Sequence, residues 1–283
     1  MTRLTGGDIG WLYDLKAFDG AIMESLGTDV FELAARAWGL EPEDARRGLN
    51  GLKLAAVTMT SGGGEIPGFA AALAATGERL GLVSRVMARP DHLGLAEACE
   101  WGADVIMHSD DDDFVARDAA SGRTVHNDPA TARAFVAALE IMNGGTLCGA
   151  KVLVIGLGKV GTLAAERIAS LGGIPFLRDT DPFRVKLAID RVPVARIVKD
   201  DSGLADEFRK GATLIFEAVP SADVVSPPVL SAMLECGVPK VAAPGVPLAW
   251  PAEWLSGGAA GRLWHDPLAS GAAAMLAGLV ARA

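Results

Sequence analysis

KVLVIGLGKVG, at residues 151–161, is the stretch that decides the fold of the second half of this chain. Its first five residues include the β-branched Val152, Val154 and Ile155, which predict a buried strand. The glycines that follow have the spacing Gly-x-Gly-x-x-Gly, and a helix is predicted from Lys159 onward. A strand, a glycine-rich loop and a helix in this order form the dinucleotide-binding fingerprint of a Rossmann domain.

Each glycine of the motif has its own task in such a site. Gly156 permits a tight turn, Gly158 lets a pyrophosphate approach the backbone, and Gly161 lets the helix pack closely on the strand. The helix amino terminus adds N–H donors and the positive end of its dipole. The alternative is an ordinary strand-to-helix turn without a ligand. The predicted cofactor-binding residues are Gly156, Leu157, Gly158, Lys159, Val160 and Gly161.

An acidic residue follows the next predicted strand, at 174–178. Asp179 stands at about the 20-residue spacing at which a carboxylate accepts hydrogen bonds from the adenosine ribose. The same carboxylate would repel a 2′-phosphate, which favours NAD over NADP. Arg178 argues in the other direction, because an arginine at this place can accommodate that phosphate. We predict NAD as the cofactor; the alternative for Asp179 is helix capping.

Two further loops in the second half leave the carboxyl ends of predicted strands. Ala218 and Pro220 follow one such strand, and Pro244 and Gly245 follow another. Ligands bind at these ends in open α/β sheets, so both loops are predicted to contact the cofactor. The alternative is that both are plain connecting loops, in which proline and glycine are also common.

Composition and charge limit the class of protein and of partner. The chain has 283 residues, 50% hydrophobic but only 6% aromatic, which suits helices packed closely on a sheet. A formal net charge of −9 argues against nucleic acid, whose phosphates require a basic surface. The three widely separated cysteines suggest reduced thiols, as in a cytosol. No secretory signal and no apolar run of about 20 residues, the length that a membrane span needs, are apparent. We expect a cytoplasmic protein without a membrane or nucleic-acid partner.

The first half alternates between strand and helix patterns as the second half does. Helices are predicted at 4–26, 29–38, 68–80, 92–101 and 130–142, and strands at 53–60, 83–87 and 103–108. This rhythm predicts a small parallel sheet. The expected fold is a two-domain α/β protein with a boundary at Gly144-Gly145. Residues 1–145 would form a substrate-binding domain with amino-terminal helices, and residues 146–283 a Rossmann domain closed by a last helix.

Several polar segments are candidates for the substrate site. Ser61, followed by three glycines, could hold an anion on backbone N–H groups or be a simple flexible turn. The aspartates at 110–113 could neutralise ammonium groups or hold a hard cation, but such a run is usually solvated. His265-Asp266 could transfer protons, although Asp266 before Pro267 also suits a helix start. The four histidines show no metal-ligand spacing, so no metal is expected.

A series of short motifs spans nearly the whole chain. The motifs are Leu4-Thr5, Thr60-Ser61-Gly62, Gly68-Phe69, Asp110-Asp111 with Phe114, Asn127 with Pro129, the glycine motif at 156–161, Ile215-Phe216-Glu217-Ala218, Ala222-Asp223, Pro244-Gly245-Val246-Pro247, and Pro267-Leu268 with Gly271. In this order they resemble the pyrrolysine synthase PylD family, the NAD-dependent dehydrogenases that perform the last step of pyrrolysine biosynthesis. The glycine motif alone is generic, whereas the full series is specific.

The resemblance implies a reaction. The family oxidises the terminal amine of the 3-methyl-D-ornithine part of a lysine–methylornithine isopeptide, with hydride passing to NAD. The imine is hydrolysed to an aldehyde with loss of ammonia. The neighbouring amine then attacks the aldehyde, and loss of water closes the pyrroline ring.

The resemblance also implies roles for residues outside the glycine motif. Asp111 would lie near a substrate ammonium group, Ser61 and Asn127 would supply hydrogen bonds, and Leu4 and Phe69 would pack on its aliphatic parts. Leu4 is expected in the first helix, which would close over the substrate. Asp111 and Asp266 are the implied catalytic residues.

Two positions depart from the family pattern. Asp266 stands where the family is expected to have glutamate, one methylene longer, and Gly6-Gly7 stand where a proline and an acid are expected. These departures keep two alternatives open: an NAD-dependent dehydrogenase of another amine or amino acid, and a non-catalytic NAD-sensing module. Oligomeric state is not decided by the sequence, and a homodimer is one option.

Overall fold

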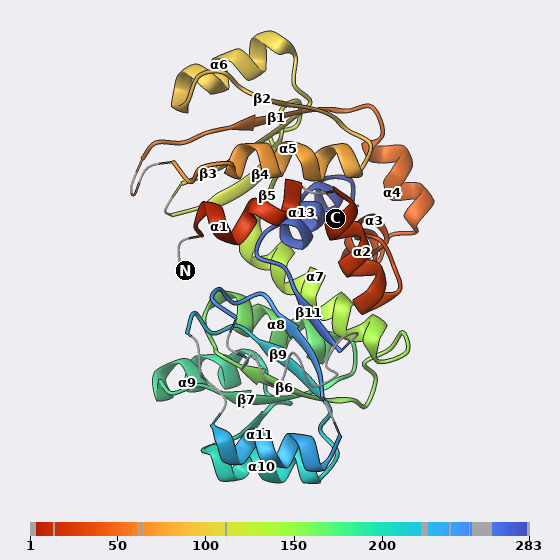
Figure 1. The fold of residues 1–283 in the computed structure, drawn as a ribbon, viewed down its shortest axis with the longest axis vertical. Helices are drawn as coiled ribbons and strands as arrows, with labels where there is room; N and C mark the ends of the chain where they lie inside the picture. Colours follow the sequence, from red (N-terminus) through yellow and green to blue (C-terminus); the bar gives the residue numbers. More distant parts are fainter. Residues whose placement is uncertain are drawn as a thin grey trace. The chain divides into compact units, whose positions relative to one another are not determined.

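The computed structural model divides the chain into two compact units. It describes residues 4–13, 15–61, 63, 65–110, 112–221, 226–237, 239–248, 250 and 262–281. The amino-terminal unit comprises residues 3–23, 28–134 and 267–283, and the carboxyl-terminal unit mainly residues 24–27 and 135–266. Figure 1 shows the elements of both. Among the described residues, no helix combines the length and apolar character that crossing a membrane requires.

The sheet of the amino-terminal unit has the strand order β2-β1-β3-β4-β5. Its strands are β1 (Lys53–Val57), β2 (Val83–Val86), β3 (Val105–Ser109), β4 (Phe114–Asp118) and β5 (Thr124–His126). The first three are parallel, as predicted, but β4 and β5 add antiparallel pairs. The sheet is therefore mixed. Short links between β3, β4 and β5 leave no room for a crossover, so the chain must reverse.

The predicted first helix is divided in the structure. It consists of α1 (Gly6–Ile9), a 3₁₀ turn η1 (Gly10–Tyr13) and α2 (Leu15–Leu26). Leu4 lies before α1, not inside a helix as expected. The start of α1 is nevertheless secured, because Asp8 Oδ2 accepts hydrogen bonds from the backbone N–H and the hydroxyl of Thr5, both at 2.7 Å. Aspartate thus helps to start a helix that Gly6-Gly7 alone would start poorly.

The other helices surround this sheet or connect to it. They are α3 (Val30–Trp38), α4 (Pro42–Leu49), α5 (Phe69–Arg79), α6 (Asp91–Trp101) and α7 (Asn127–Met142), of which α7 continues into the second unit.

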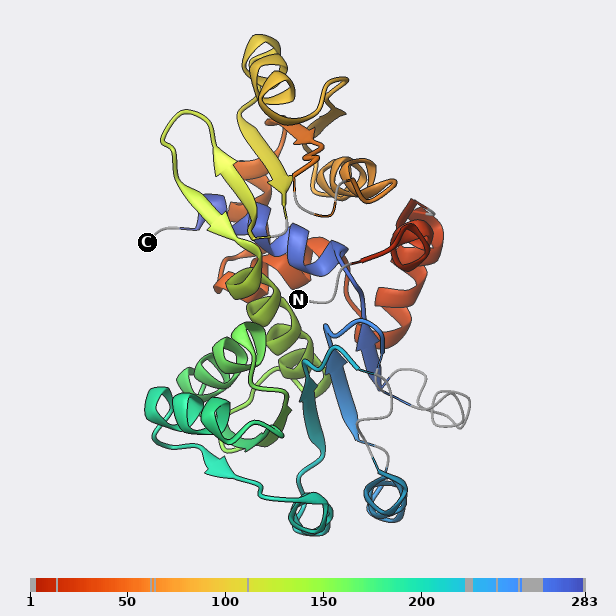
Figure 2. The same cartoon turned by 90° about the vertical axis from the view of Figure 1, so that its left-hand side faces the viewer.

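The last helix, α13 (Ala269–Val280), packs within the amino-terminal unit, mainly against α3. In Figure 2 it lies, in blue, among the red helices of the early chain. Trp38 Nε1 donates to the carbonyl of Ala274 at 2.7 Å, and a Cβ at Gly278 would come within 2.6 Å of the Trp38 ring. The division therefore differs from the predicted boundary, which gave residues 267–283 to the Rossmann domain.

The carboxyl-terminal unit contains a parallel sheet of order β11-β10-β9-β6-β7-β8. The strands are β6 (Lys151–Ile155), β7 (Ile174–Arg178), β8 (Arg196–Ile197), β9 (Leu214–Glu217), β10 (Lys240–Ala243) and β11 (Leu263–His265). The helices are α8 (Lys159–Ser170), α9 (Pro182–Arg191), α10 (Asp201–Arg209) and α11 (Pro227–Glu235). The chain runs from β6 to β7 and β8, then returns to β9 on the other side. This change of direction makes the carboxyl end of β6 a topological switch point, where ligands bind in such sheets.

Candidate functional site

The glycine motif forms a close-packed turn between β6 and α8. Gly156 has φ +88°, which L side chains rarely adopt, and a Cβ there would lie 2.7 Å from the carbonyl oxygen of Ala218. At Gly161 a Cβ would lie 1.8 Å from the Gly156 carbonyl oxygen. Both positions therefore exclude any side chain, and the predicted reasons for these two glycines agree with the geometry.

Gly158 is open where the other two glycines are crowded. A Cβ at this position would meet no atom of the described chain within 4 Å. Gly158 is the N-cap of α8, no side chain caps it, and the first turn of that helix carries no acid. The amino terminus of α8 thus combines free space above Gly158 with the positive potential of the helix dipole. These features fit a dinucleotide pyrophosphate, which requires close approach to backbone N–H groups.

Asp179 is held at the end of β7 by two backbone amides. Its Oδ2 accepts from the N–H of Leu157 at 2.6 Å, and its Oδ1 accepts from the N–H of Asp181 at 2.8 Å. These bonds tie the carboxylate directly to the glycine loop. An acid fixed there lies where dinucleotide-binding folds place the carboxylate that contacts the ribose hydroxyls.

The two other predicted cofactor loops contact each other. A Cβ at Gly245 would lie 2.6 Å from the carbonyl oxygen of Val219, so the loop of Pro244 and Gly245 lies against the loop of Ala218 and Pro220. Glu217, which the sequence reasoning did not assign to the site, is fully buried at the end of β9, and its Oε1 accepts from the Val219 N–H at 2.5 Å. An acid at the end of an otherwise apolar strand is the signal that could have identified it.

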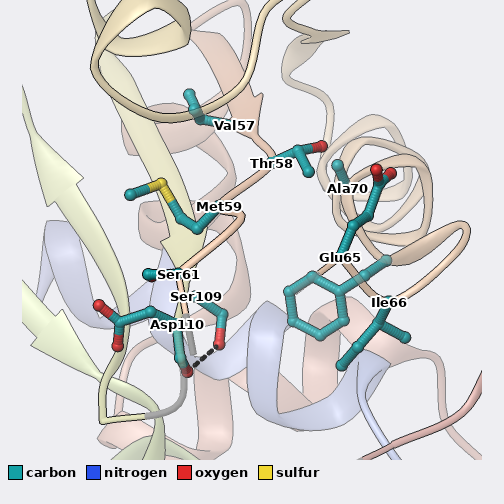
Figure 3. Close-up of a pocket in the computed structure, with 10 residues that line it drawn as sticks. Val57, Thr58, Met59, Ser61, Glu65, Ile66, Ala70, Ser109 and Asp110 are labelled. Atoms are coloured by element: carbon teal, nitrogen blue, oxygen red, sulfur yellow. Dashed lines mark hydrogen bonds between the residues drawn. The ribbon is translucent and has the colours of Figure 1, made fainter. Parts of the chain in front are cut away.

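A pocket opens in the amino-terminal unit at the carboxyl end of β1 (Figure 3). Its empty volume is about 420 Å³, which includes space open to solvent. Two of the predicted substrate residues, Ser61 and Phe69, line it together. Phe69 also contacts Phe114 edge to face, with ring centroids 5.3 Å apart. The remaining lining residues are Val57, Thr58, Met59, Glu65, Ile66, Ala70, Ser109 and Asp110.

The pocket carries negative charge. Asp110 and Glu65 both line it, and the N–H groups of Asp113 and Asp112 donate to Asp110 Oδ1 at 2.8 and 2.9 Å. These hydrogen bonds lower the pKa of Asp110 below its ordinary value, so its carboxylate is ionised at neutral pH. Such a pocket favours cationic groups over anions. The predicted catalytic residue Asp111 lies outside the described residues.

Leu4 and Asn127 do not line this pocket, although both belong to the same unit. Leu4 is half-buried just before α1, and a Cβ at Gly6 would lie 3.4 Å from the carbonyl oxygen of Pro67. The start of α1 thus lies beside the loop that carries Ile66. Asn127 begins α7, and its Oδ1 accepts from the Thr131 hydroxyl at 2.9 Å.

Asp266 is buried directly after β11 in the carboxyl-terminal unit, with 2% of its surface exposed. The neighbouring His265 ring lies with Nδ1 2.7 Å from the Ala243 carbonyl oxygen, so this nitrogen is the protonated donor. The ring is therefore oriented by β10. Within the described chain, no group of three or more His, Cys, Asp or Glu side chains has the arrangement of a metal site.

Comparison with known proteins finds relatives over nearly the whole chain. Residues 13–125 match the family of the pyrrolysine biosynthesis protein PylD, N-terminal domain. A pyrrolysine synthase of Methanosarcina barkeri is 31% identical over 278 residues, covering 98% of this chain and 97% of that protein. A pyrrolysine synthase of Methanosarcina acetivorans is 30% identical over 263 residues, covering 93% of each.

One solved structure extends the comparison to the fold. Shikimate dehydrogenase of Aquifex aeolicus aligns with a TM-score of 0.52 over 82% of this chain and 98% of that chain, at 12% identity. This likeness confirms the two-domain α/β class that the sequence predicts.

Proposed function

The chain belongs to the pyrrolysine biosynthesis protein PylD family, and from this membership we propose that it is an NAD-dependent dehydrogenase that forms the pyrroline ring of pyrrolysine. The proposed substrate is the lysine–3-methyl-D-ornithine isopeptide. The observation that carries the proposal is the match to pyrrolysine synthases over 98% of the chain, with the dinucleotide motif intact inside it.

The proposed reaction begins with a two-electron oxidation. The terminal CH–NH₂ carbon of the methylornithine part loses a hydride and the nitrogen loses a proton, which gives an imine. When bound, NAD supplies the hydride acceptor. Water then converts the imine to an aldehyde and ammonia, and the second amine condenses with the aldehyde, releasing water.

The carboxyl-terminal unit is proposed to hold the cofactor. Gly156 and Gly161 keep the loop compact, Gly158 leaves room for the pyrophosphate, and Asp179 accepts hydrogen bonds from the ribose. The loops at 218–220 and 244–245 are proposed to complete the site. A fixed cradle of this kind orients the cofactor and reduces the entropy that binding costs.

The amino-terminal unit is proposed to hold the substrate in its acidic pocket. The isopeptide carries several ammonium groups, and the ionised Asp110 attracts them. Ser61 would donate or accept a hydrogen bond, and the ring of Phe69 would pack on methylene groups. Asp111, Asn127 and Leu4 remain proposed substrate contacts, of which Asp111 would bind the ammonium group.

Asp266 is proposed to orient the reacting amine or to accept its proton. The family resemblance is the ground for this role, and Asp266 is buried directly after β11. The side chain is one methylene shorter than the expected glutamate. This difference favours a second candidate function, in which the enzyme oxidises another amine of similar charge.

The direct test is to mix the purified chain with NAD and the isopeptide, then to follow NADH absorbance and analyse the product by mass. NADH with a pyrroline-containing product supports the first proposal. NADH with other amines but not with the isopeptide supports the second. Cofactor binding without hydride transfer from any amine would indicate that the protein is a non-catalytic NAD-sensing module. Asp266→Glu, which restores the expected length, should raise isopeptide turnover if the first proposal holds.

A further inference from the structure

The end of β7 carries two side chains with opposite preferences for the cofactor. Asp179 disfavours a 2′-phosphate on the adenosine ribose, whereas an arginine in the position of Arg178 can bind that phosphate. An arginine beside the selecting acid would weaken discrimination against NADP if its charge were available. What the guanidinium contacts therefore bears on cofactor choice.

The Arg178 guanidinium is engaged on two sides. Its Nη1 donates to the carbonyl oxygen of Asp179 at 3.0 Å, and its Nη2 lies 3.6 Å from Oδ1 of Asp201. The Arg178 side chain is 21% exposed and that of Asp201 is 49% exposed. The pair is a loose one near solvent, so it contributes little to stability but still offsets the arginine charge locally.

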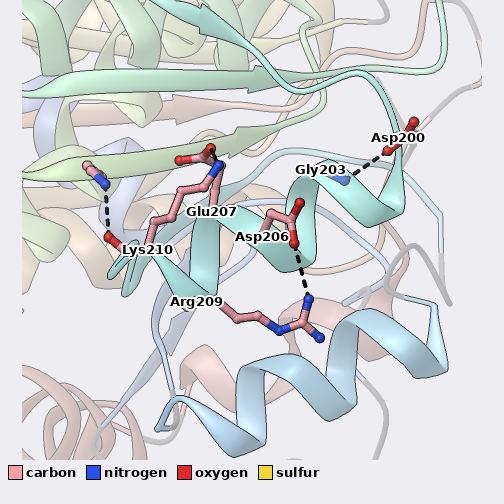
Figure 4. Close-up of polar contacts among 7 residues, drawn as sticks. Asp200, Gly203, Asp206, Glu207, Arg209 and Lys210 are labelled. Carbon is pink, nitrogen blue, oxygen red and sulfur yellow. Dashed lines mark hydrogen bonds and ion pairs between the residues drawn. The ribbon is translucent and has the colours of Figure 1, made fainter.

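Asp201 is held in place by the start of α10. The preceding residue, Asp200, is the N-cap of this helix, and its Oδ1 accepts from the N–H of Gly203 at 2.8 Å (Figure 4). The two neighbouring acids thus have separate tasks. Asp200 caps the helix, and Asp201, as its first residue, faces Arg178.

We propose that Asp201 is a specificity-determining residue that selects NAD over NADP by neutralising Arg178. The inference rests on the proposed dinucleotide-binding function and deepens it. Asp179 repels the 2′-phosphate directly, while Asp201 withholds the cation that could compensate that repulsion. A phosphate that approached Arg178 would have to share the guanidinium with Asp201, whose negative charge repels it as well.

The test compares NAD and NADP binding to the full chain by isothermal titration calorimetry, without any amine substrate. Asp201→Asn should tighten NADP binding roughly three- to tenfold, because it removes one negative charge that lies on the other side of the Arg178 guanidinium from the 2′-phosphate. The estimate takes the dielectric constant near the surface as close to that of water. The same change should alter NAD binding by less than about twofold, because NAD has no 2′-phosphate.

Three further variants test whether the effect depends on the Arg178–Asp201 pair. Asp206→Asn removes the same charge from the same helix, at an acid that pairs with Arg209 instead, and should leave the NAD to NADP ratio unchanged. In Arg178→Gln combined with Asp201→Asn the gain in NADP binding should disappear. Asp201→Ser, which keeps a residue suited to a helix start, should repeat the effect of Asp201→Asn.

The outcomes separate this inference from the proposed function. If the unsubstituted chain binds NAD but Asp201→Asn and Asp206→Asn shift the ratio equally, Asp201 has no selecting role. The same holds if the gain survives without Arg178. If the unsubstituted chain binds neither dinucleotide, the proposed function fails and the inference fails with it.

Discussion

Replacing Gly158 or Gly161 by alanine should separate cofactor binding from folding. In Gly161→Ala the new Cβ would lie 1.8 Å from the Gly156 carbonyl oxygen. The β6–α8 turn must then open by more than an ångström, and overpacking of this kind costs about 1–3 kcal/mol. For a protein of this size the loss corresponds to a drop in Tm of roughly 3–10 °C.

Gly158→Ala should behave differently, although it adds the same methyl group three positions earlier in the same motif. Its Cβ would meet no described atom within 4 Å, so the free energy of unfolding should change by less than about 0.5 kcal/mol. The methyl group would instead occupy the space proposed for the pyrophosphate. NAD affinity should fall about ten- to a hundredfold, which equals a steric cost of roughly 1.4–2.8 kcal/mol.

The assay is thermal unfolding of both variants without cofactor, together with calorimetric titration of NAD. Gly20→Ala serves as the control, because a Cβ at this exposed position in α2 also meets nothing within 4 Å and lies in the other unit. It should keep full NAD affinity and gain slightly in stability. Normal NAD affinity in Gly158→Ala would refute the placement of the pyrophosphate over this glycine. An unchanged Tm in Gly161→Ala would refute the close packing of the turn.

Three other perturbations have defined outcomes. Asp110→Asn removes an ionised carboxylate from the pocket and should weaken binding of the isopeptide, whose ammonium groups outnumber its carboxylate, about threefold to tenfold. The loss should appear as an increase in KM with kcat less affected, and an unchanged KM would mean that the charge of this pocket does not bind substrate. Hydrogen bonds from the hydroxyl and N–H of Thr60 lower the pKa of Asp91, so the stability they provide is full above the ordinary pKa and is lost as pH falls through the lowered value. Asp91→Asn should therefore reduce the loss of stability at acid pH in urea unfolding, and an unaltered pH profile would contradict the assignment. Trp38→Phe removes the 2.7 Å hydrogen bond to the Ala274 carbonyl and should lower the free energy of unfolding by about 0.5–1.5 kcal/mol. Equal stability in urea would show that α13 does not depend on this bond.

The local structure of the proposed cofactor site could be predicted because its signals are local. The β-branched strand, the three glycines and the helix lie within one short stretch, and backbone sterics dictate the turn between them. Glu217 was not assigned to the site from the sequence, because its contact with the Val219 N–H depends on how the loop after β9 folds. The alternation of strands and helices likewise predicted the class of fold, and the acidic residue after β7 lies where a ribose-binding carboxylate is expected.

For the proposed substrate site, the residues alone indicated Ser61 and the aspartates at 110–113 as candidates, whereas the choice of Phe69, Asn127 and Leu4 came from the resemblance to a family. Ser61, Phe69 and Asp110 line one pocket, yet they come from a loop, a helix start and a strand end that are far apart in the sequence. No periodicity indicates that these three segments meet. Leu4 was expected inside a helix, but the structure starts the helix two residues later, where Asp8 binds the Thr5 backbone.

By itself, the sequence determined a two-domain α/β protein of negative charge, with a dinucleotide motif in its second half. The tertiary structure alone decided that the first sheet is mixed and that α13 packs with α3 instead of closing the second unit. The physical reason is the range of the interactions. A glycine turn is selected by clashes between neighbouring residues, whereas the position of α13 depends on small residues, such as Gly278, that fit against a tryptophan 240 positions earlier in the chain.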